Sequence, residues 1–167
     1  MDAGSGGIRS AFQFKSYKID KCKFFSKPDL SILNYSEFIP ADAWKLAIGV
    51  RNPLFFQQEK NYVGGFDLKL EISDETNKSE TLPEEHIFLK FELGIAGVFV
   101  VEEGRLSQEL EEGLVKVHIP AILLPYARGA ATSFLANAGF GSVIFPLINI
   151  HVLAKEQMKD RKVVVIE

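Results

Sequence analysis

Apolar and polar residues alternate one by one along several stretches in the first two thirds of the chain. The clearest stretch covers residues 66–72, where every second residue is large and apolar and the residues between are Asp, Lys and Glu. A period of two places the apolar side chains on one face of a strand and the charged ones on the other. A sheet with one buried face and one solvent-exposed face is typically antiparallel, so this stretch predicts an antiparallel strand.

Three further stretches share this alternation. Residues 12–25 alternate with a phase slip near residues 16–17, which predicts a β-bulge. Residues 45–56 alternate but are interrupted at Asn52 and Pro53, and residues 87–101 form the third stretch. In the last of these stretches the residues in phase are Leu89, Phe91, Leu93 and Ile95. With residues 66–72 the three stretches predict a four-stranded antiparallel sheet, a meander with one crossover.

Two segments between the predicted strands lack periodicity. Residues 73–80 are polar and predict a hairpin loop. Residues 28–40 contain two prolines, and Pro40 is incompatible with a central strand position, so this segment predicts the crossover between the first two strands.

After residue 101 the period changes to that of helices. Leu106, Leu110 and Leu114 recur every four residues and predict a short helix or helical turn. A principal helix is expected to begin at Pro120, a residue suited to a first helical turn, and to end at Gly139. Pro125 is expected in the first turn or at a kink.

The end of the chain predicts a further helix over residues 149–159 and a β-prone run at residues 163–166. That run is interpreted first as a frayed tail or edge strand, and alternatively as a segment that occupies a sheet edge or groove. The predicted fold class is α+β, with the sheet packed against the long helix and the C-terminal helix. Residues 1–10 are expected to be a flexible leader or a cloning remnant, residues 11–154 one domain, and residues 155–167 a charged tail.

Composition narrows the class of function. Fourteen Phe, one Trp and four Tyr exceed what a small core needs, and surplus rings tend to face a partner. A net charge of −3 creates no positive electrostatic field that would attract phosphates, so nucleic acid is not expected as a partner. The lone Cys22 cannot form an internal disulfide, and we expect a cytosolic protein with no membrane insertion.

No pattern in the sequence indicates catalysis or a cofactor. His86, His118 and His151 stand far apart, without the spacing of metal ligands, and a metal is not expected. The paired glycines at residues 94–97 and 139–141 do not continue into a nucleotide-binding motif and are typical of turns and helix ends. The chain is therefore expected not to be an enzyme.

One motif is specific. Ile119-Pro120 is followed by Leu124-Pro125-Tyr126-Ala127-Arg128 and by a helix ending at Gly139. This order resembles the SecB protein-export chaperone family, which carries a Phe-Pro-Tyr-Ala-Arg signature in this place, with Leu124 here replacing the Phe. An opening Phe12-Gln13-Phe14 strand agrees, and the resemblance covers nearly the whole chain.

The resemblance implies a homotetramer, a dimer of dimers, that binds unfolded or precursor polypeptides in apolar grooves and delivers them to the SecA motor without a cofactor. Whether this chain forms a tetramer or a dimer stays open. The resemblance places the long helix at a subunit interface, with four candidate residues: Tyr126, Arg128, Ala131 and Phe134. Large rings near the crossover and the strand ends are the candidates for the peptide groove: Phe38, Trp44, Phe55, Phe56 and Phe99.

The departures from the family pattern leave alternatives. Lys21 and Phe25 stand where the family presents acidic residues to SecA, whereas Glu92 keeps its acid and is the candidate docking residue. A SecB-like chaperone dedicated to one partner, such as an antitoxin, is therefore the second hypothesis. A small apolar ligand-binding protein or an enzyme is the alternative from another class.

Overall fold

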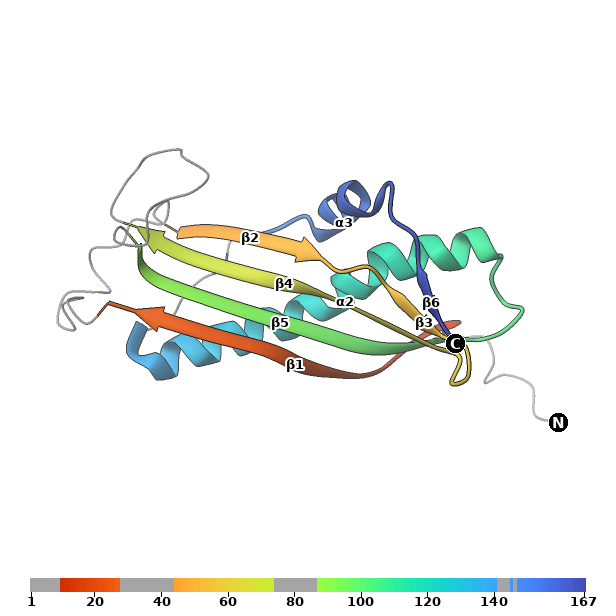
Figure 1. Ribbon diagram of the computed structural model, residues 1–167, viewed down its shortest axis with the longest axis horizontal. Coiled ribbons are helices and arrows are strands. Elements are labelled where there is room, and N and C mark those ends of the chain that lie inside the picture. The colour runs from red at the N-terminus through yellow and green to blue at the C-terminus, as the bar shows by residue number, and fades with distance from the viewer. Residues whose placement is uncertain (1–9, 28–43, 74–86, 141–144, 146) are drawn as a thin grey trace.

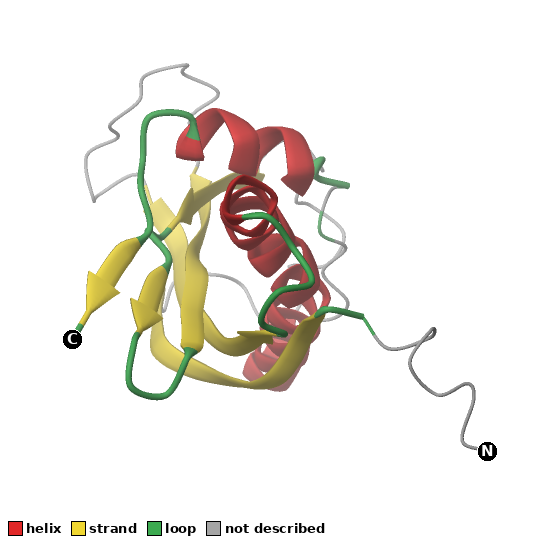
Figure 2. Cartoon of the chain, turned by 90° about the vertical axis from the view of Figure 1, so that its right-hand side faces the viewer, coloured by secondary structure: helices red, strands yellow, loops and turns green. Residues whose placement is uncertain are grey.

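The computed structural model describes residues 10–27, 44–73, 87–140, 145 and 147–167. One layer is a β-sheet, and helices cover one of its faces (Figures 1 and 2). The strands are β1 (Phe12–Ser26), β2 (Trp44–Val50), β3 (Leu54–Phe56), β4 (Asn61–Ser73), β5 (Ile87–Val101) and β6 (Val164–Ile166). The helices are α2 (Gln108–Leu135), a five-residue π turn (Ala136–Phe140) and α3 (Ile150–Met158). The α+β class predicted from the sequence is confirmed.

Within the described residues the sheet has six strands in the order β1-β5-β4-β3-β6, and β2 also pairs with β4. Strands β2 to β5 form the predicted antiparallel meander, and β1 lies on the far side of β5. The strand count exceeds the expected four for two reasons. The interruption at Asn52 and Pro53 divides one predicted strand into β2 and β3, and β6 pairs in parallel with β3. The predicted crossover and hairpin loop fall on residues outside the described part of the chain, apart from Ser73 at the end of β4.

Strand β1 is irregular, as the phase slip in its alternation predicts. Its pairing with β5 shifts register between Phe14 and Ser16 and again between Ile19 and Lys21. The first shift lies next to the predicted bulge. Because each shift changes which side chains face the helix, Phe14, Tyr17 and Phe24 share the helix-facing side despite their uneven spacing.

The core lies between α2 and the helix-facing side of β4 and β5. Phe66, Leu68 and Ile95 are almost completely buried there, against Ile119 and Leu123 of the helix. These strand residues occupy every second position, so the same alternation that predicts the strands also builds the core.

The helix begins earlier than predicted. Residues 108–135 form one continuous helix that contains both Pro120 and Pro125, so the expectation of a separate helical turn before a helix starting at Pro120 was wrong. Ser107 caps the helix, since its side-chain oxygen accepts a hydrogen bond from the backbone N–H of Leu110. Proline costs a helix one hydrogen bond, but tertiary packing of an apolar face decides most helix stability. Here the buried face continues on both sides of Pro120, through Val115, Ile119, Leu123, Ala127 and Ala131.

One glycine lies just past α2, and two others lie within β5. Gly139 has a φ of 96°, a left-handed conformation that suits glycine just past a helix, as predicted. Gly94 and Gly97 were expected in turns, but both lie within β5. A Cβ atom at Gly97 would lie 2.9 Å from Cδ2 of Leu123, so this glycine allows α2 to pack closely on the sheet.

Helix α3 begins after Asn149, whose side chain accepts a hydrogen bond from the N–H of Val152. This helix confirms the one predicted near the end of the chain.

Candidate functional site

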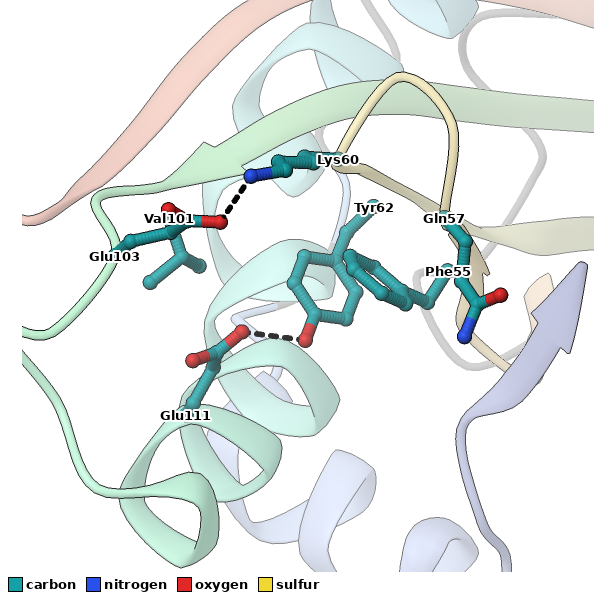
Figure 3. A pocket seen from close by; sticks show the side chains of 7 residues that line it. All are labelled: Phe55, Gln57, Lys60, Tyr62, Val101, Glu103 and Glu111. Atoms are coloured by element: carbon teal, nitrogen blue, oxygen red, sulfur yellow. Dashed lines mark hydrogen bonds and ion pairs between the residues drawn. The ribbon is translucent and has the colours of Figure 1, made fainter. Parts of the chain in front are cut away.

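A surface pocket of about 420 Å³ lies where the β3–β4 hairpin faces the end of β5 and the first turns of α2 (Figure 3). Side chains from all these elements and from the loop after β5 line it. They are Phe55, Gln57, Lys60, Tyr62, Val101, Glu103 and Glu111. The hairpin places its lining residues close together because Phe55 and Tyr62 are directly paired across the two strands.

Two aromatic rings form the apolar side of the pocket. The ring centroids of Phe55 and Tyr62 are 4.7 Å apart with a tilt of 35°. Tyr62 is buried, whereas Phe55 is half-buried and its ring keeps an accessible part. A tilted aromatic pair of this kind provides a rigid apolar surface that a side chain of another polypeptide can contact.

Four of the polar side chains that line the pocket are paired with one another. Lys60 forms an ion pair with Glu103 across the mouth. The hydroxyl of Tyr62 donates a hydrogen bond to Oε1 of Glu111 at 2.5 Å. Burial, and then this hydrogen bond to the carboxylate, raise the pKa of the Tyr62 phenol above its ordinary value. The Tyr62 phenol is thus held in its neutral form as a hydrogen-bond donor to Glu111.

The structure brings together only part of the predicted peptide-binding set. Phe55 lines the pocket, and Phe56, its half-buried neighbour on β3, pairs with Asn61. Trp44 begins β2 opposite Ile72, away from the lining residues. Phe38 lies outside the described residues.

Phe99 occupies a different environment from Phe55. Its side chain is fully buried, and its ring centroid lies 5.2 Å from those of both Phe12 and Phe14. It therefore packs within the core, beneath the surface that a bound chain would contact. Sequence analysis missed Tyr62 and Glu111, and the position of Tyr62 directly opposite Phe55 emerges only once the hairpin is formed.

A second aromatic cluster lies along β1 and the neighbouring side of α2. The Tyr126 ring is 4.6 Å from Tyr17 and 5.5 Å from Phe14, and the Phe134 ring is 5.2 Å from Phe24. Tyr126 is 40% exposed and Tyr17 45% exposed, although both are large rings. We call these five residues the β1–α2 margin.

The margin borders an edge of the sheet. Within the described part of the chain β1 pairs with β5 alone, over fifteen residues, so the backbone groups on its other side face outward. Sequence analysis assigned Tyr126 and Phe134 to an interface and missed the three rings of β1. Their uneven spacing across two register shifts hides the shared face.

The other two residues assigned to the interface contribute differently. Ala131 is fully buried against the core. The Nη2 group of Arg128 donates a hydrogen bond of 3.3 Å to the carbonyl oxygen of Phe145. Arg128 thus holds the chain beyond the π turn against the helix.

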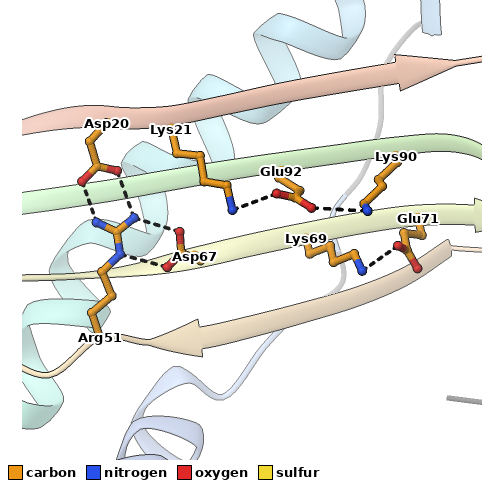
Figure 4. A network of polar contacts seen from close by, with 8 residues as sticks. All are labelled: Asp20, Lys21, Arg51, Asp67, Lys69, Glu71, Lys90 and Glu92. Atoms are coloured by element: carbon orange, nitrogen blue, oxygen red, sulfur yellow. Dashed lines mark hydrogen bonds and ion pairs between the residues drawn. The ribbon is translucent and has the colours of Figure 1, made fainter. Parts of the chain in front are cut away.

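The sheet face away from α2 carries a polar network (Figure 4). The Arg51 guanidinium donates two hydrogen bonds to Asp20, of 2.6 and 2.9 Å, and two to Asp67, of 2.8 and 2.9 Å. These hydrogen bonds lower the pKa of both carboxyl groups and raise that of Arg51. Arg51 therefore links β1 to β4 from the segment between β2 and β3.

Glu92, the predicted docking residue, belongs to the same face and is already paired. Its carboxylate lies 2.8 Å from Nζ of Lys21 and 3.6 Å from Nζ of Lys90. The hydrogen bond from Lys21 lowers the pKa of Glu92 below its ordinary value. A partner that needs this acid must compete with two lysines of the same chain.

The fold also brings together His118 and His151, and the third histidine, His86, lies outside the described residues. The rings of His118 on α2 and His151 on α3 are 5.9 Å apart. In the described part of the chain, no group of three or more His, Cys, Asp and Glu residues is arranged to hold a metal ion. None of the helices described here is long and apolar enough to cross a membrane.

Comparisons with known proteins agree with one another. The family described as "Preprotein translocase subunit SecB" matches residues 48–161. The protein-export protein SecB of Dechloromonas aromatica is 31% identical over 80 residues, which are 48% of this chain and 51% of that protein, so the chain spans about half of its length. The SecB protein of Aromatoleum aromaticum is 28% identical over 137 residues, covering 80% of this chain and 82% of the relative.

A solved structure shares the fold. It is a SecB-like chaperone of Mycobacterium tuberculosis in complex with a ChAD peptide from the HigA1 antitoxin. The TM-score is 0.54 at 11% sequence identity, and the match covers 82% of this chain and 90% of that chain.

Proposed function

Because the chain belongs to the SecB family, we propose that it is a chaperone of the holdase type, which binds unfolded segments of other polypeptides in the cytosol and delays their aggregation. The observation that carries this proposal is the aromatic pocket formed by Phe55 and Tyr62 at the exposed end of the sheet. Part of its apolar surface is accessible, and each of its charged groups has a partner within the pocket, which suits apolar side chains of varied sequence.

Binding of this kind does not require a nucleotide, a metal or a reacting group. An extended client contributes side chains to the aromatic surface and backbone groups to hydrogen bonds, and both interactions tolerate different client sequences. We therefore assign Phe55 and Phe56 to client contact, with Trp44 and Phe38 as further candidates. Catalysis is not part of the proposed function.

An aggregation assay tests the proposal. The chain is added to a chemically unfolded client, and light scattering is followed after dilution of the denaturant. Delayed scattering at stoichiometric amounts is expected, and Phe55→Ala is expected to weaken it several-fold. Phe25→Ala is the matched control, because Phe25 is 52% exposed on the opposite face of the sheet. A chain that delays the aggregation of no client would remove the proposal.

We also infer that the chain assembles as a homotetramer, with the β1–α2 margin at one of its interfaces. Exposed rings beside an outward-facing strand are typical of a surface that pairs with another chain. Tyr126 and Phe134 are then interface residues, whereas Ala131 and Arg128 support the helix that carries them.

A chaperone dedicated to one partner, such as an antitoxin, is the second candidate. The specific observation in its favour is the state of Glu92, whose pairing with Lys21 and Lys90 weakens the acidic character of the face that would dock SecA. Purified SecA and the antitoxin encoded beside a toxin, where such a pair exists, are the two ligands to compare by surface plasmon resonance. Tight binding of SecA together with many precursors would exclude the dedicated form.

A further inference from the structure

The last turn of α3 and the segment after it follow one edge of the sheet, the edge made by β2 and β3. The side chain of Gln157 replaces a strand there: its Nε2 donates a hydrogen bond of 2.8 Å to the carbonyl of Ile48, and its Oε1 accepts one of 2.7 Å from the N–H of Val50. Arg161 continues the contact, since its Nη1 donates a hydrogen bond of 3.0 Å to the carbonyl of Val50. Side chains therefore satisfy the backbone groups at the end of β2.

Backbone pairing takes over along β3. The N–H of Val164 donates a hydrogen bond of 2.9 Å to the carbonyl of Pro53, and the N–H of Gln57 donates one of 3.0 Å to the carbonyl of Ile166. Between these two bonds β6 runs parallel to β3, with Val165 opposite Phe55. The edge from Ile48 to Gln57 is thus covered by residues 157–166 of the same chain.

Strand β6 buries little of its own surface. Val164, Val165 and Ile166 are 41%, 53% and 37% exposed, although all three are aliphatic. The strand is three residues long and, among the strands described, pairs with β3 alone. That pairing is parallel, which is slightly less stable per residue than an antiparallel one. Only the preceding Val163 packs against the core. Strand β6 is accordingly held by a few backbone hydrogen bonds, and its side chains contribute little.

The covered edge adjoins the aromatic pocket. Phe55 pairs with Tyr62 on one side and with Val165 on the other, so the three residues form one row across β4, β3 and β6. Figure 3 shows β6 passing beside Phe55 and Gln57 at the pocket. A strand in the place of β6 therefore brings every second side chain to the side on which the pocket lies.

We propose that the edge of β3 is a strand-addition site for an extended, aliphatic-rich polypeptide segment, and that β6 is an intramolecular occupant which such a segment displaces. The proposal rests on the proposed chaperone function and names the edge through which a client binds. The edge supplies the backbone hydrogen bonds, the pocket beside Phe55 selects apolar side chains, and β6 itself shows the chemistry of the ligand.

This arrangement makes client binding competitive. While β6 is docked the edge is closed, and the apparent affinity for a client equals the intrinsic affinity multiplied by the fraction of molecules in which β6 is released. Gln157 and Arg161 lie before β6 and keep their contacts with β2 when β6 leaves, so the released strand stays nearby and redocks after the client dissociates. The segment thereby raises the intrinsic affinity that a client needs in order to bind.

A proline substitution tests the proposal in the full chain. Val164→Pro removes the N–H that bonds to Pro53 and is expected to release β6. Val165→Thr is the matched control, because it keeps the backbone donors and the side-chain volume. A second variant that ends at Lys162 lacks β6 altogether, and its circular dichroism and thermal unfolding show whether the sheet is intact.

Two probes are titrated by fluorescence anisotropy. The first is a labelled synthetic peptide with the sequence of residues 161–167, and the second is reduced, carboxymethylated lactalbumin, which is permanently unfolded. Val164→Pro and the shortened chain are expected to bind both probes about tenfold or more tightly than the unaltered chain, as expected when a segment docked about nine tenths of the time is removed. Val165→Thr is expected to bind like the unaltered chain.

The outcomes separate this inference from the chaperone function. If lactalbumin binds all four proteins with equal affinity, the chaperone function stands and the displacement of β6 is wrong. If lactalbumin binds none of them but the peptide binds only the two proteins without a docked β6, the strand-addition site stands and the chaperone function falls. If Val164→Pro and the shortened chain bind neither probe and instead self-associate, β6 only protects the edge, and the proposal is overturned.

Discussion

Gly94 lies directly against Arg51: a Cβ atom at Gly94 would lie 2.3 Å from Nη2 of the guanidinium and 2.7 Å from Oδ1 of Asp20. No side chain fits at such distances without displacing the network. The absence of a side chain at this point of β5 therefore allows Arg51 to reach across the sheet and bind both carboxylates (Figure 4).

Gly94→Ala is expected to lower the free energy of unfolding by about 1–3 kcal/mol, because the added methyl group separates Arg51 from its partners. Urea unfolding measures the change. Gly49→Ala is the control, since among the described atoms none lies within 4 Å of a Cβ atom at Gly49. An equal loss in both variants, or the same loss from Gly94→Ala in an Arg51→Ala background, contradicts the explanation.

The carboxyl groups bound to Arg51 predict how stability depends on pH. Hydrogen bonds from Arg51 lower the pKa of Asp20 and Asp67 in the folded chain, so their contribution is present above the unfolded pKa near 3.8 and is lost as the pH falls through the folded values. Both side chains are partly exposed, which limits the contribution to about 1–2 kcal/mol. Urea unfolding between pH 7 and pH 2.5 should therefore show a steeper loss below about pH 4 than in the double variant Asp20→Asn, Asp67→Asn.

An exposed carboxyl group provides the comparison for that pH series. Asp160→Asn, in the turn after α3, is the matched control, because Asp160 is exposed and lies outside the Arg51 network. A double variant whose unfolding curve keeps the full acid dependence would show that other carboxyl groups cause it.

Local patterns predicted the elements well. The alternation in residues 66–72 predicted a strand with one buried face, and Phe66, Leu68, Leu70 and Ile72 of β4 are buried, because a period of two is a property of neighbouring residues. The Pro-Tyr-Ala-Arg motif identified the family for a similar reason, because its four residues are consecutive in the sequence. The two prolines in α2 misled the prediction of its start because local propensity there yields to the packing of a continuous apolar face.

Contacts between distant residues were not predictable in this way. Arg51 lies 31 residues from Asp20 and 16 from Asp67, and Gln157 lies 107 residues from Val50. No local pattern links such residues before the sheet has formed. The glycines of β5 were assigned to turns because the same residue type serves turns and close packing, and only the neighbouring side chains distinguish the two uses.

The Tyr62 hydroxyl provides a titration that reports on the pocket. Because the pKa of Tyr62 is raised in the folded chain, its neutral form stabilises the fold below the unfolded pKa near 10, and this contribution is lost as the pH rises above that value. Tyr62→Phe is expected to reduce the free energy of unfolding at pH 7 by about 0.5–1.5 kcal/mol through loss of the hydrogen bond to Glu111. Ultraviolet absorbance of phenolate, recorded against Tyr62→Phe, isolates this residue.

Glu111→Gln keeps an acceptor for the Tyr62 hydroxyl but removes the negative charge. Tyr62 in that variant is expected to titrate at lower pH than in the unaltered chain, because the charge no longer opposes ionisation. Identical titration curves would assign the raised pKa to burial alone.

The β1–α2 margin predicts which residues disrupt assembly. Tyr126→Glu places a carboxylate on the exposed aromatic surface beside Tyr17, and burying that charge at an interface costs several kcal/mol. The variant is therefore expected to have a smaller mass by light scattering than the unaltered chain at the same concentration. Leu110→Glu is the matched control, because Leu110 is 61% exposed at the start of α2 and lies outside the margin. Unchanged mass in Tyr126→Glu, with the fold intact by circular dichroism, excludes the margin as an interface, whereas a reduced mass in both variants means that added charge in general prevents assembly.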